Sequence, residues 1–402
     1  MQHTLSISLV TGTATAILGA GLACGLTSCS PKTCTGFDVS APTRTELVEV
    51  ANFPEHQVTG VAVSRRGRVF ISFPRWGGTY AMGVAELLPD GSHVAYPDAE
   101  WNRSNEDLRS PPEGDAFVCV QSVHVDDRDR LWVLDPAAPK LETVLRGAGG
   151  GPKLIEIDLS SNAVTRVIRF DESVAPAKSY LNDVRVDTRS NHAFITDSGL
   201  GAIVVVDLST GHARRVLDGH ESTEARPDFV PIVEGRELMT PAGATPRVHS
   251  DGLALDAKGN WLYYQSLTDD RLFRISTRVL TSPGTMEWQI EDSVQAEGKS
   301  VVTDGMICDR LGNLYFTALE HDAIVQRNPR GNMLTLAKDA KIAWPDSLAI
   351  GAAGPVAVGE RVPPGEWLYF TTSQIHRTPM FSPSGEWPVT PYRLFRVRLP
   401  GG

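Results

Sequence analysis

Six segments of the chain repeat one pattern of polar and apolar positions. Each begins with a polar residue, and the second residue is small in most cases. The third and fifth residues are apolar, and the fourth residue between them varies. These segments are residues 59–64, 121–126, 182–187, 251–256, 304–309 and 346–351, and their first residues lie 62, 61, 69, 53 and 42 positions apart. Self-similarity at such spacings is typical of repeat architectures, in which each repeat is one supersecondary unit.

Each segment leads through a turn into further runs of β-branched and aromatic residues, which favour strands. Examples of the second, third and fourth strands of a unit are residues 131–135, 193–197, 203–207 and 214–217. No long helical periodicity interrupts them. Four strands in each of six units predict an all-β fold, a six-bladed β-propeller.

The last unit ends with its third strand, residues 392–397. We expect residues 45–50 to supply the missing outer strand, so that the N-terminal strand closes the last blade. Such a closure joins the two ends of the domain and prevents the ring from opening. The propeller is therefore expected to span residues 45–402.

The segment before the propeller resembles an export signal. Residues 5–26 carry no charged side chain, and a lipobox-like run ends at Cys29. We interpret residues 1–29 as a signal peptide and residues 30–44 as a tether, which places the protein outside the cytoplasm: secreted, periplasmic or at the cell surface. A lipid on Cys29 would anchor it to a membrane. The alternative is a plain signal peptide with incidental cysteines.

Charge and cysteine content narrow the function classes. The 402 residues carry a formal net charge of −10. Proteins that bind nucleic acid or an anionic membrane surface need basic patches, so this acidic balance argues against both partners. Three cysteines follow the signal, Cys34, Cys119 and Cys308, and their odd number and wide spacing form no disulfide framework. Cys119 and Cys308 lie in apolar runs, so we expect buried thiols. We expect a monomer with a small-molecule ligand.

The first residues of the six segments are candidates for a binding site. The inner strands of a propeller start at the same face, so these side chains should converge at one end of the central channel. They are Thr59, Gln121, Asn182, Asp251, Asp304 and Asp346, and His249 and His376 can reach the same face. Three carboxylates this close repel unless a cation, a ligand amine or a raised pKa compensates. Oxygen ligands favour Ca²⁺ or another divalent cation. Alternatively, these residues only begin strands and are solvated by water.

Several stretches are similar in amino-acid sequence, and in their order along the chain, to the Yellow/major royal jelly protein family. They are residues 73–76, 96–102, 129–135, 152–154, 158–159, 179–183 and 344–346. The resemblance implies a propeller from about residue 45 to the end. It leaves the activity open, because the family includes dopachrome-converting proteins, food proteins and binders of biogenic amines, and its bacterial members are grouped with dopachrome tautomerases.

The ring is also similar to that of the gluconolactonase/senescence-marker propellers, which hold a divalent metal with a Glu, an Asn and an Asp. Asn182 and Asp251 match two of these ligands. The expected Glu is Thr59 here, with Gln57 nearby. This departure puts lactonase chemistry in doubt, although Asp304 or Asp346 can replace the missing carboxylate.

Three functional hypotheses follow, and the sequence contains no nucleophile elbow, HExxH motif or P-loop that would favour other chemistry. The first is a dopachrome-type tautomerase, with Asp251, Asp304 or His249 as base and Gln121, Asn182, Asp346 and His376 contacting the ligand. The second is a lactonase whose metal is held by Asn182, Asp251 and Asp304. The third is a binding or scaffold protein without catalysis.

Overall fold

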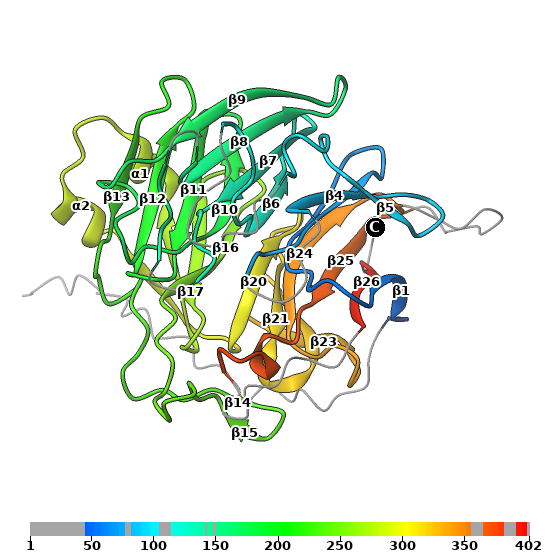
Figure 1. Ribbon diagram of the computed structural model, residues 1–402. Coiled ribbons are helices and arrows are strands. Elements are labelled where there is room, and N and C mark those ends of the chain that lie inside the picture. The colour runs from blue at the N-terminus through cyan, green and yellow to red at the C-terminus, as the bar shows by residue number, and fades with distance from the viewer. Residues whose placement is uncertain are drawn as a thin grey trace, which may run out of the picture. The chain divides into compact units, whose positions relative to one another are not determined.

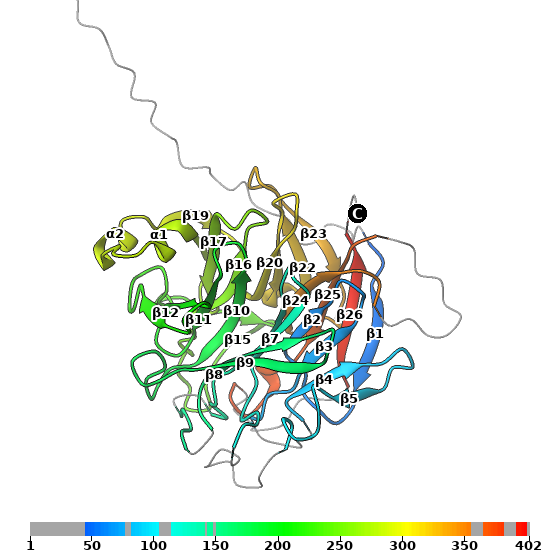
Figure 2. The ribbon, with the colours of Figure 1, turned by 90° about the horizontal axis from the view of Figure 1, so that it is seen from above.

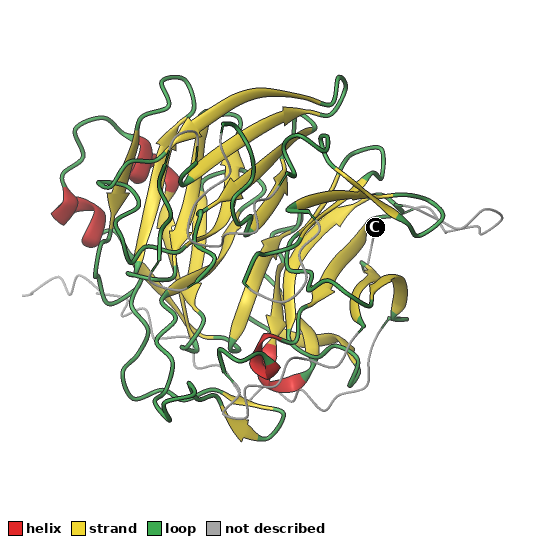
Figure 3. Cartoon of the chain, in the orientation of Figure 1, coloured by secondary structure: helices red, strands yellow, loops and turns green. Residues whose placement is uncertain are grey.

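A computed structural model describes residues 45–76, 82–103, 114–140, 143–147, 150–354, 365–381 and 391–399. The chain divides into two units, Met1–Thr33 and Cys34–Gly402, and every described residue belongs to the second. The predicted signal peptide, Cys29, Cys34 and the tether therefore lie outside the described residues. Within the described part, strands dominate (Figure 3). No helix there is long and apolar enough to cross a membrane.

The strands form six antiparallel four-stranded sheets, each a blade of the predicted six-bladed propeller (Figure 1). Blade 1 contains β2 (Val61–Val63), β3 (Val69–Ser72), β4 (Val84–Leu87) and β5 (His93–Ala95); blade 2 contains β6 (Ser122–Val125), β7 (Arg130–Asp135), β8 (Lys153–Asp158) and β9 (Ala163–Arg169); blade 3 contains β10 (Leu181–Asp187), β11 (His192–Asp197), β12 (Ala202–Asp207) and β13 (Ala213–Val216).

The second half of the ring follows the same order. Blade 4 contains β16 (Ser250–Leu255), β17 (Trp261–Ser266), β18 (Arg271–Ser276) and β19 (Gln295–Lys299); blade 5 contains β20 (Thr303–Cys308), β21 (Leu314–Ala318), β22 (Ala323–Arg327) and β23 (Met333–Lys338); blade 6 contains β24 (Pro345–Gly351), β25 (Trp367–Thr372), β26 (Tyr392–Arg398) and β1 (Val48–Phe53). The innermost strands are those of the predicted repeats, and each contacts its neighbours around the ring, β24 contacting β2.

Short elements among the described residues lie outside the six sheets, including the 3₁₀ turns Leu319–His321 and Ile375–Arg377. The hairpin of β14 (Ile232–Val233) and β15 (Arg236–Glu237) follows blade 3 and precedes blade 4 in the chain, and it lies away from the six sheets (Figure 1). The helices α1 (Thr277–Thr281) and α2 (Glu287–Glu291) connect β18 to β19.

The N-terminal strand closes blade 6 as predicted. β1 pairs antiparallel with β26, from Val48 opposite Arg396 to Phe53 opposite Tyr392, so the two ends of the domain lie side by side (Figure 2). The strand begins three residues later than the predicted run from residue 45.

The hydrophobic core consists of wedges between blades. Six clusters of buried residues each join two consecutive blades. The wedge between blades 6 and 1 holds Phe53 of β1, Val61 of β2 and Tyr369 of β25. Because every blade is buried between two others, the core is complete only when the ring is closed.

The start of the inner strands is irregular in blades 3 to 6. The pairing with the second strand shifts register between residues 181 and 184, 250 and 253, 303 and 306, and 345 and 348. Such bulges bend a strand and re-aim its side chains. In blade 5 the hydroxyl of Thr317 accepts hydrogen bonds from the freed N–H groups of Asp304 and Gly305, at 3.1 and 2.9 Å.

The inner strands also approach each other closely at this end. A Cβ atom on Gly305 would lie 2.2 Å from the backbone oxygen of Asp346, and one on Gly252 would lie 2.7 Å from that of Asp304. Glycine after the aspartate therefore allows consecutive blades to meet, which brings the aspartates together.

Candidate functional site

Three buried carboxylates meet where the inner strands of blades 4 to 6 begin. Asp251, Asp304 and Asp346 are 1, 7 and 4% exposed. Asp251 is hydrogen bonded to Asp304, and the charge of Asp304 acts on both other carboxyl groups. The predicted convergence of these three residues is therefore found in the structure.

Burial shifts the proton equilibria of this cluster. It raises the pKa of Asp304 to about 7, although hydrogen bonds from Trp344 and Asp251 oppose the shift. Burial, and then the charge of Asp304, raise the pKa of Asp251 and of Asp346 well above the usual range. The cluster therefore holds protons at neutral pH, and a protonated Asp251 can donate to Asp304.

Two carboxylate oxygens of the cluster lack a partner. Within the described residues, Asp251 Oδ2 and Asp346 Oδ2 are buried and accept no hydrogen bond. A buried acceptor without a partner is costly, so these atoms are available to a proton, a cation or a ligand donor.

A chain of hydrogen bonds borders the cluster on the side of blades 2 and 3. The indole N–H of Trp76 donates to Tyr180 Oη at 2.7 Å, and the Tyr180 hydroxyl donates to Gln121 Oε1 at 2.8 Å. Gln121 Nε2 then donates to Asn182 Oδ1 at 3.0 Å, and Asn182 Nδ2 to Ser198 Oγ at 3.2 Å. The two predicted amides thus contact each other and present a polar, uncharged wall.

Trp344 connects the cluster to His376. Its indole N–H donates to Asp304 Oδ2 at 2.7 Å, and its ring stacks on His376 with centroids 5.5 Å apart. His376 Nε2 lies 3.0 Å from Glu234 Oε2, on the loop between β14 and β15. Burial lowers the pKa of His376, while Glu234 opposes the shift. Trp344 has a φ of 51°, a left-handed conformation that is rare for a bulky residue and often found at functional sites.

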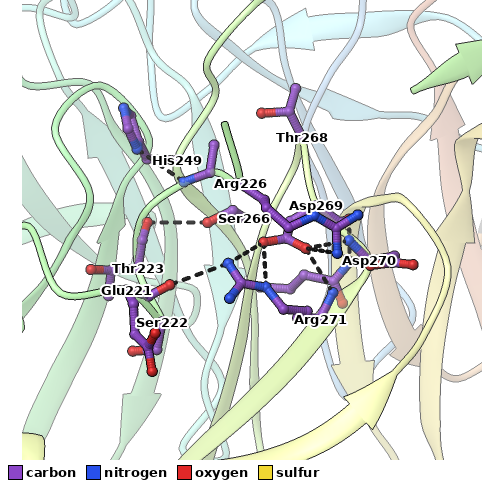
Figure 4. A network of polar contacts seen from close by, with 12 residues as sticks. Glu221, Ser222, Thr223, Arg226, His249, Ser266, Thr268, Asp269, Asp270 and Arg271 are labelled. Atoms are coloured by element: carbon purple, nitrogen blue, oxygen red, sulfur yellow. Dashed lines mark hydrogen bonds and ion pairs between the residues drawn. The ribbon is translucent and has the colours of Figure 1, made fainter. Parts of the chain in front are cut away.

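The His249 ring is hydrogen bonded to the backbone of the loop that contains Ala225. Its Nδ1 accepts a hydrogen bond from the Ala225 N–H at 3.1 Å, beside the network of Arg226, Asp269 and Arg271 (Figure 4). Burial lowers the pKa of His249, and the charges that act on it include Glu224, not the cluster. No hydrogen bond or ion pair between described residues joins His249 to the three aspartates.

Thr59 also differs from its expected position at the ring. It is completely buried, and its hydroxyl lies 3.5 Å from both Ser72 Oγ and the backbone oxygen of Gln121. Gln57, considered as a substitute ligand, donates to the backbone oxygen of Ser373 at 2.8 Å. The Thr59 hydroxyl and the Gln57 amide therefore contact neighbouring blades.

The metal ligands predicted from the sequence stay a prediction. Asn182, Asp251 and Asp304 lie at the same end of the channel, but no group of three or more His, Cys, Asp and Glu side chains in the described ranges has the arrangement of a metal site. The two unpartnered carboxylate oxygens fit a hard cation.

Three contributors to the site were not assigned a role from the sequence. Tyr180 and Trp344 each lie two positions before a ring residue, and both belong to stretches that carried the family resemblance. Asp183, the residue after Asn182, is also buried, and its charge raises the pKa values of Asp251, Asp304 and Asp346. Their proximity to ring residues was the available signal.

The fold and the site define a class of protein: a six-bladed β-propeller with a buried acidic cluster at one end of its channel. Residues 118–360 match the family model described as "Major royal jelly protein". The chain belongs to this family. It is 21% identical over 270 residues to Major royal jelly protein 7 of Apis mellifera, a match covering 64% of this chain and 57% of that protein. The match thus spans little more than half the length of this relative.

Solved structures share the fold. A gluconolactonase from Xanthomonas campestris has a TM-score of 0.50 at 13% identity, covering 89% of this chain and 90% of its own. A luciferin-regenerating enzyme has a TM-score of 0.51 at 11% identity, covering 89% and 96%. At these identities the likeness shows the propeller architecture, and function has to be argued from the site.

Proposed function

We propose that this chain binds a small molecule at the acidic end of its channel and moves a proton on it, in a tautomerisation of the dopachrome type. The observation that carries the proposal is the buried cluster of Asp251, Asp304 and Asp346, in which burial raises the pKa of Asp304 to about 7. A group that exchanges its proton near neutral pH is best suited to general acid–base catalysis at that pH. Family membership supports the same reaction, because dopachrome-converting proteins occur in this family.

The neighbours of Asp304 support this role. Ionised Asp304 removes a proton from a carbon that a nearby carbonyl group acidifies, and protonated Asp251 or Asp346 returns one at the position where the charge accumulates. Trp344 orients Asp304 through its indole N–H. Gln121 and Asn182 offer amide groups to polar substituents, and His376 supports the Trp344 ring. His249 is not the base in this scheme, because its Nδ1 already accepts a hydrogen bond from the Ala225 N–H.

The test measures the conversion of L-dopachrome by the purified chain. The reaction is monitored as the loss of the dopachrome colour. Asp304→Asn keeps the shape of the side chain and should lower kcat by about 10²- to 10⁴-fold, the usual contribution of a general acid or base. Asp90→Asn is the matched control, because Asp90 is exposed and bonds to Ser92 in its own turn. Equal activity of the wild-type chain and Asp304→Asn would exclude Asp304 as the base.

Metal-dependent lactone hydrolysis is the second candidate. The favouring observation is the pair of unpartnered buried oxygens on Asp251 and Asp346. Asp251 and Asp304, with Asn182, would hold a divalent cation, which would polarise a lactone carbonyl and activate water. A gluconolactonase is among the proteins that share this fold. Stoichiometric Ca²⁺ in the purified protein, with lactone hydrolysis lost on chelation, would favour this candidate, whereas dopachrome turnover in EDTA would favour the tautomerase.

A binding protein without catalysis is the third candidate. The same unpartnered carboxylate oxygens can accept hydrogen bonds from a ligand ammonium group. Calorimetric titration with a biogenic amine, together with absence of turnover of dopachrome and lactone, would favour it. Substitution of Asp251 and Asp346 by Asn should then weaken amine binding.

We also propose that the protein is exported and anchored by a lipid at Cys29. The uncharged segment 5–26 and the lipobox-like run support this location. Expression of the full chain and of Cys29→Ser in a bacterial host, with detergent phase partitioning and mass spectrometry of the N-terminus, tests it. An unlipidated N-terminus in the wild-type chain would contradict the anchor. Size-exclusion chromatography with light scattering tests the expected monomer.

A further inference from the structure

A cavity of about 750 Å³ lies at the end of the channel where the inner strands finish. Its lining includes an apolar residue from each of the six inner strands: Val63, Val125, Val186, Leu255, Ile307 and Ile350. Asp251 and Leu255 are four positions apart in β16, which is about 13 Å along the strand. The cavity is therefore separate from the carboxylate cluster, and its size is typical of small-molecule sites.

The charged lining of the cavity consists of six acidic residues and of Arg65, Arg185, Arg189 and Arg310, and His124 lies beside them. Arg189 pairs with Asp187, Arg310 pairs with Glu366, and Arg65 donates to the backbone oxygen of Asp127. Arg185 is 7% exposed. Its Nη1 donates to the backbone oxygen of Val184 at 2.7 Å and its Nη2 to that of Met306 at 2.6 Å. Its Nε is buried and has no hydrogen-bond partner among the described residues. Burial, and then the charge of Arg185, lower the pKa of His124 to about 3, so His124 is neutral at physiological pH.

The buried guanidinium is only partly balanced by the protein. The nearest carboxylate is Asp183, whose Oδ2 lies 3.7 Å from Arg185 Nη2, on the side of the acidic cluster. Arg185 is buried, and because water cannot solvate its charge there, burial lowers the pKa of the guanidinium. An anion that entered the cavity would therefore meet a charge that water does not screen.

Each of the six carboxylates that line the same cavity accepts hydrogen bonds. Asp127 accepts from Thr188, Asp187 from Arg189, Asp256 from the N–H groups of Asn260 and Trp261, and Glu366 from Arg310. Asp126 accepts hydrogen bonds from Arg130 and from the indole N–H of Trp132. Asp309 accepts from Tyr315 and from backbone N–H groups of the turn that follows. Every lining carboxylate therefore has a donor, whereas the buried Nε–H of Arg185 has no acceptor among the described residues.

We propose that this cavity binds a small organic acid with an apolar body, whose carboxylate meets the Arg185 guanidinium and whose body lies against the six apolar side chains. Burying a charged donor is favourable only when an acceptor satisfies it, and a carboxylate is the natural partner of a guanidinium. The site is independent of the proposed tautomerase site at the other end of the channel.

The test is isothermal titration calorimetry of the purified chain with three probes of one shape: 4-phenylbutyrate, 4-phenylbutyramide and 4-phenylbutylamine. The acid should bind at least about tenfold more tightly than the neutral amide, because a hydrogen bond to a charged group is lost with the amide. Arg185→Met should abolish this preference. Asp251→Asn, which alters only the acidic cluster, should leave acid binding unchanged even though it impairs the proposed catalysis.

Three results would overturn the proposal: no binding of the acid, equal binding of acid and amide by the wild-type chain, or an unchanged preference in Arg185→Met. If Arg185→Met does not fold, Ile350→Trp replaces it, because Ile350 is partly exposed on the cavity wall and a larger side chain fills the space. Folded Ile350→Trp should lose acid binding at least tenfold. Retention of full affinity would place the acid elsewhere and contradict the site.

Discussion

Asp304→Asn should make the protein less sensitive to rising pH. The folded pKa of Asp304 is about 7, against 3.8 for an unperturbed Asp. Between these values the folded state binds a proton that the unfolded chain has released, so the free energy of unfolding falls as pH rises. A pKa difference of one unit corresponds to about 1.36 kcal/mol, so ionisation of Asp304 should lower the free energy of unfolding by about 4 kcal/mol in total. Asn cannot ionise and avoids this loss.

The assay is urea unfolding of both proteins from pH 4 to pH 8, followed by tryptophan fluorescence. The difference in unfolding free energy between Asp304→Asn and the wild-type chain should grow in favour of Asn by about 4 kcal/mol across this window. The charge of Asp304 also raises the pKa of Asp251, so the variant should relieve part of the strain there too. For Asp90 the pH dependence of stability has the opposite sign. Hydrogen bonds from Ser92 lower the pKa of the Asp90 carboxyl group, so the stability that these bonds contribute is lost as pH falls through this lowered pKa.

Parallel curves for the wild-type chain and Asp304→Asn would refute the reasoning for the metal-free protein. A bound divalent cation would keep the cluster ionised and suppress the pH dependence. The titration is therefore done with EDTA and again with Ca²⁺. A dependence that appears only in EDTA would favour the metal site over the tautomerase.

Three further substitutions test the fold and the site. Gly305→Ala places a methyl group 2.2 Å from a backbone oxygen of blade 6 and should cost about 1–3 kcal/mol in urea unfolding; an unchanged midpoint would mean that the blades can separate freely. Phe53→Ala, in the closing strand, should cost about 3–5 kcal/mol, whereas Val94→Ala, 45% exposed, should stay within about 0.5 kcal/mol; equal effects would mean that closure contributes little. Trp344→Phe removes a hydrogen bond that lowers the pKa of Asp304, so an NMR titration of that carboxyl group should move to higher pH; an unmoved midpoint would contradict the contact.

The repeat pattern was sufficient to predict the propeller, its six inner strands and its closure by the N-terminal strand. Alternation of apolar residues and turn chemistry are local signals, and six copies of one unit leave few ways to bury their faces. The same pattern predicted the convergence of Asp251, Asp304 and Asp346, because residues at equivalent places in a closed ring must lie near its axis. It also predicted a buried Cys119, whereas Cys308, expected to be buried, is only partly so.

The sequence by itself thus determined the architecture and which end of the channel is acidic. Tertiary structure decided which contacts the side chains make there: Trp344 reaches Asp304 from a left-handed backbone position, Thr59 is buried between blades, and His249 accepts a hydrogen bond from the Ala225 N–H. The cavity around Arg185 likewise depends on strands from all six blades. The physical reason is that strand pattern is a property of neighbouring residues, whereas orientation and pKa depend on contacts between residues far apart in the chain.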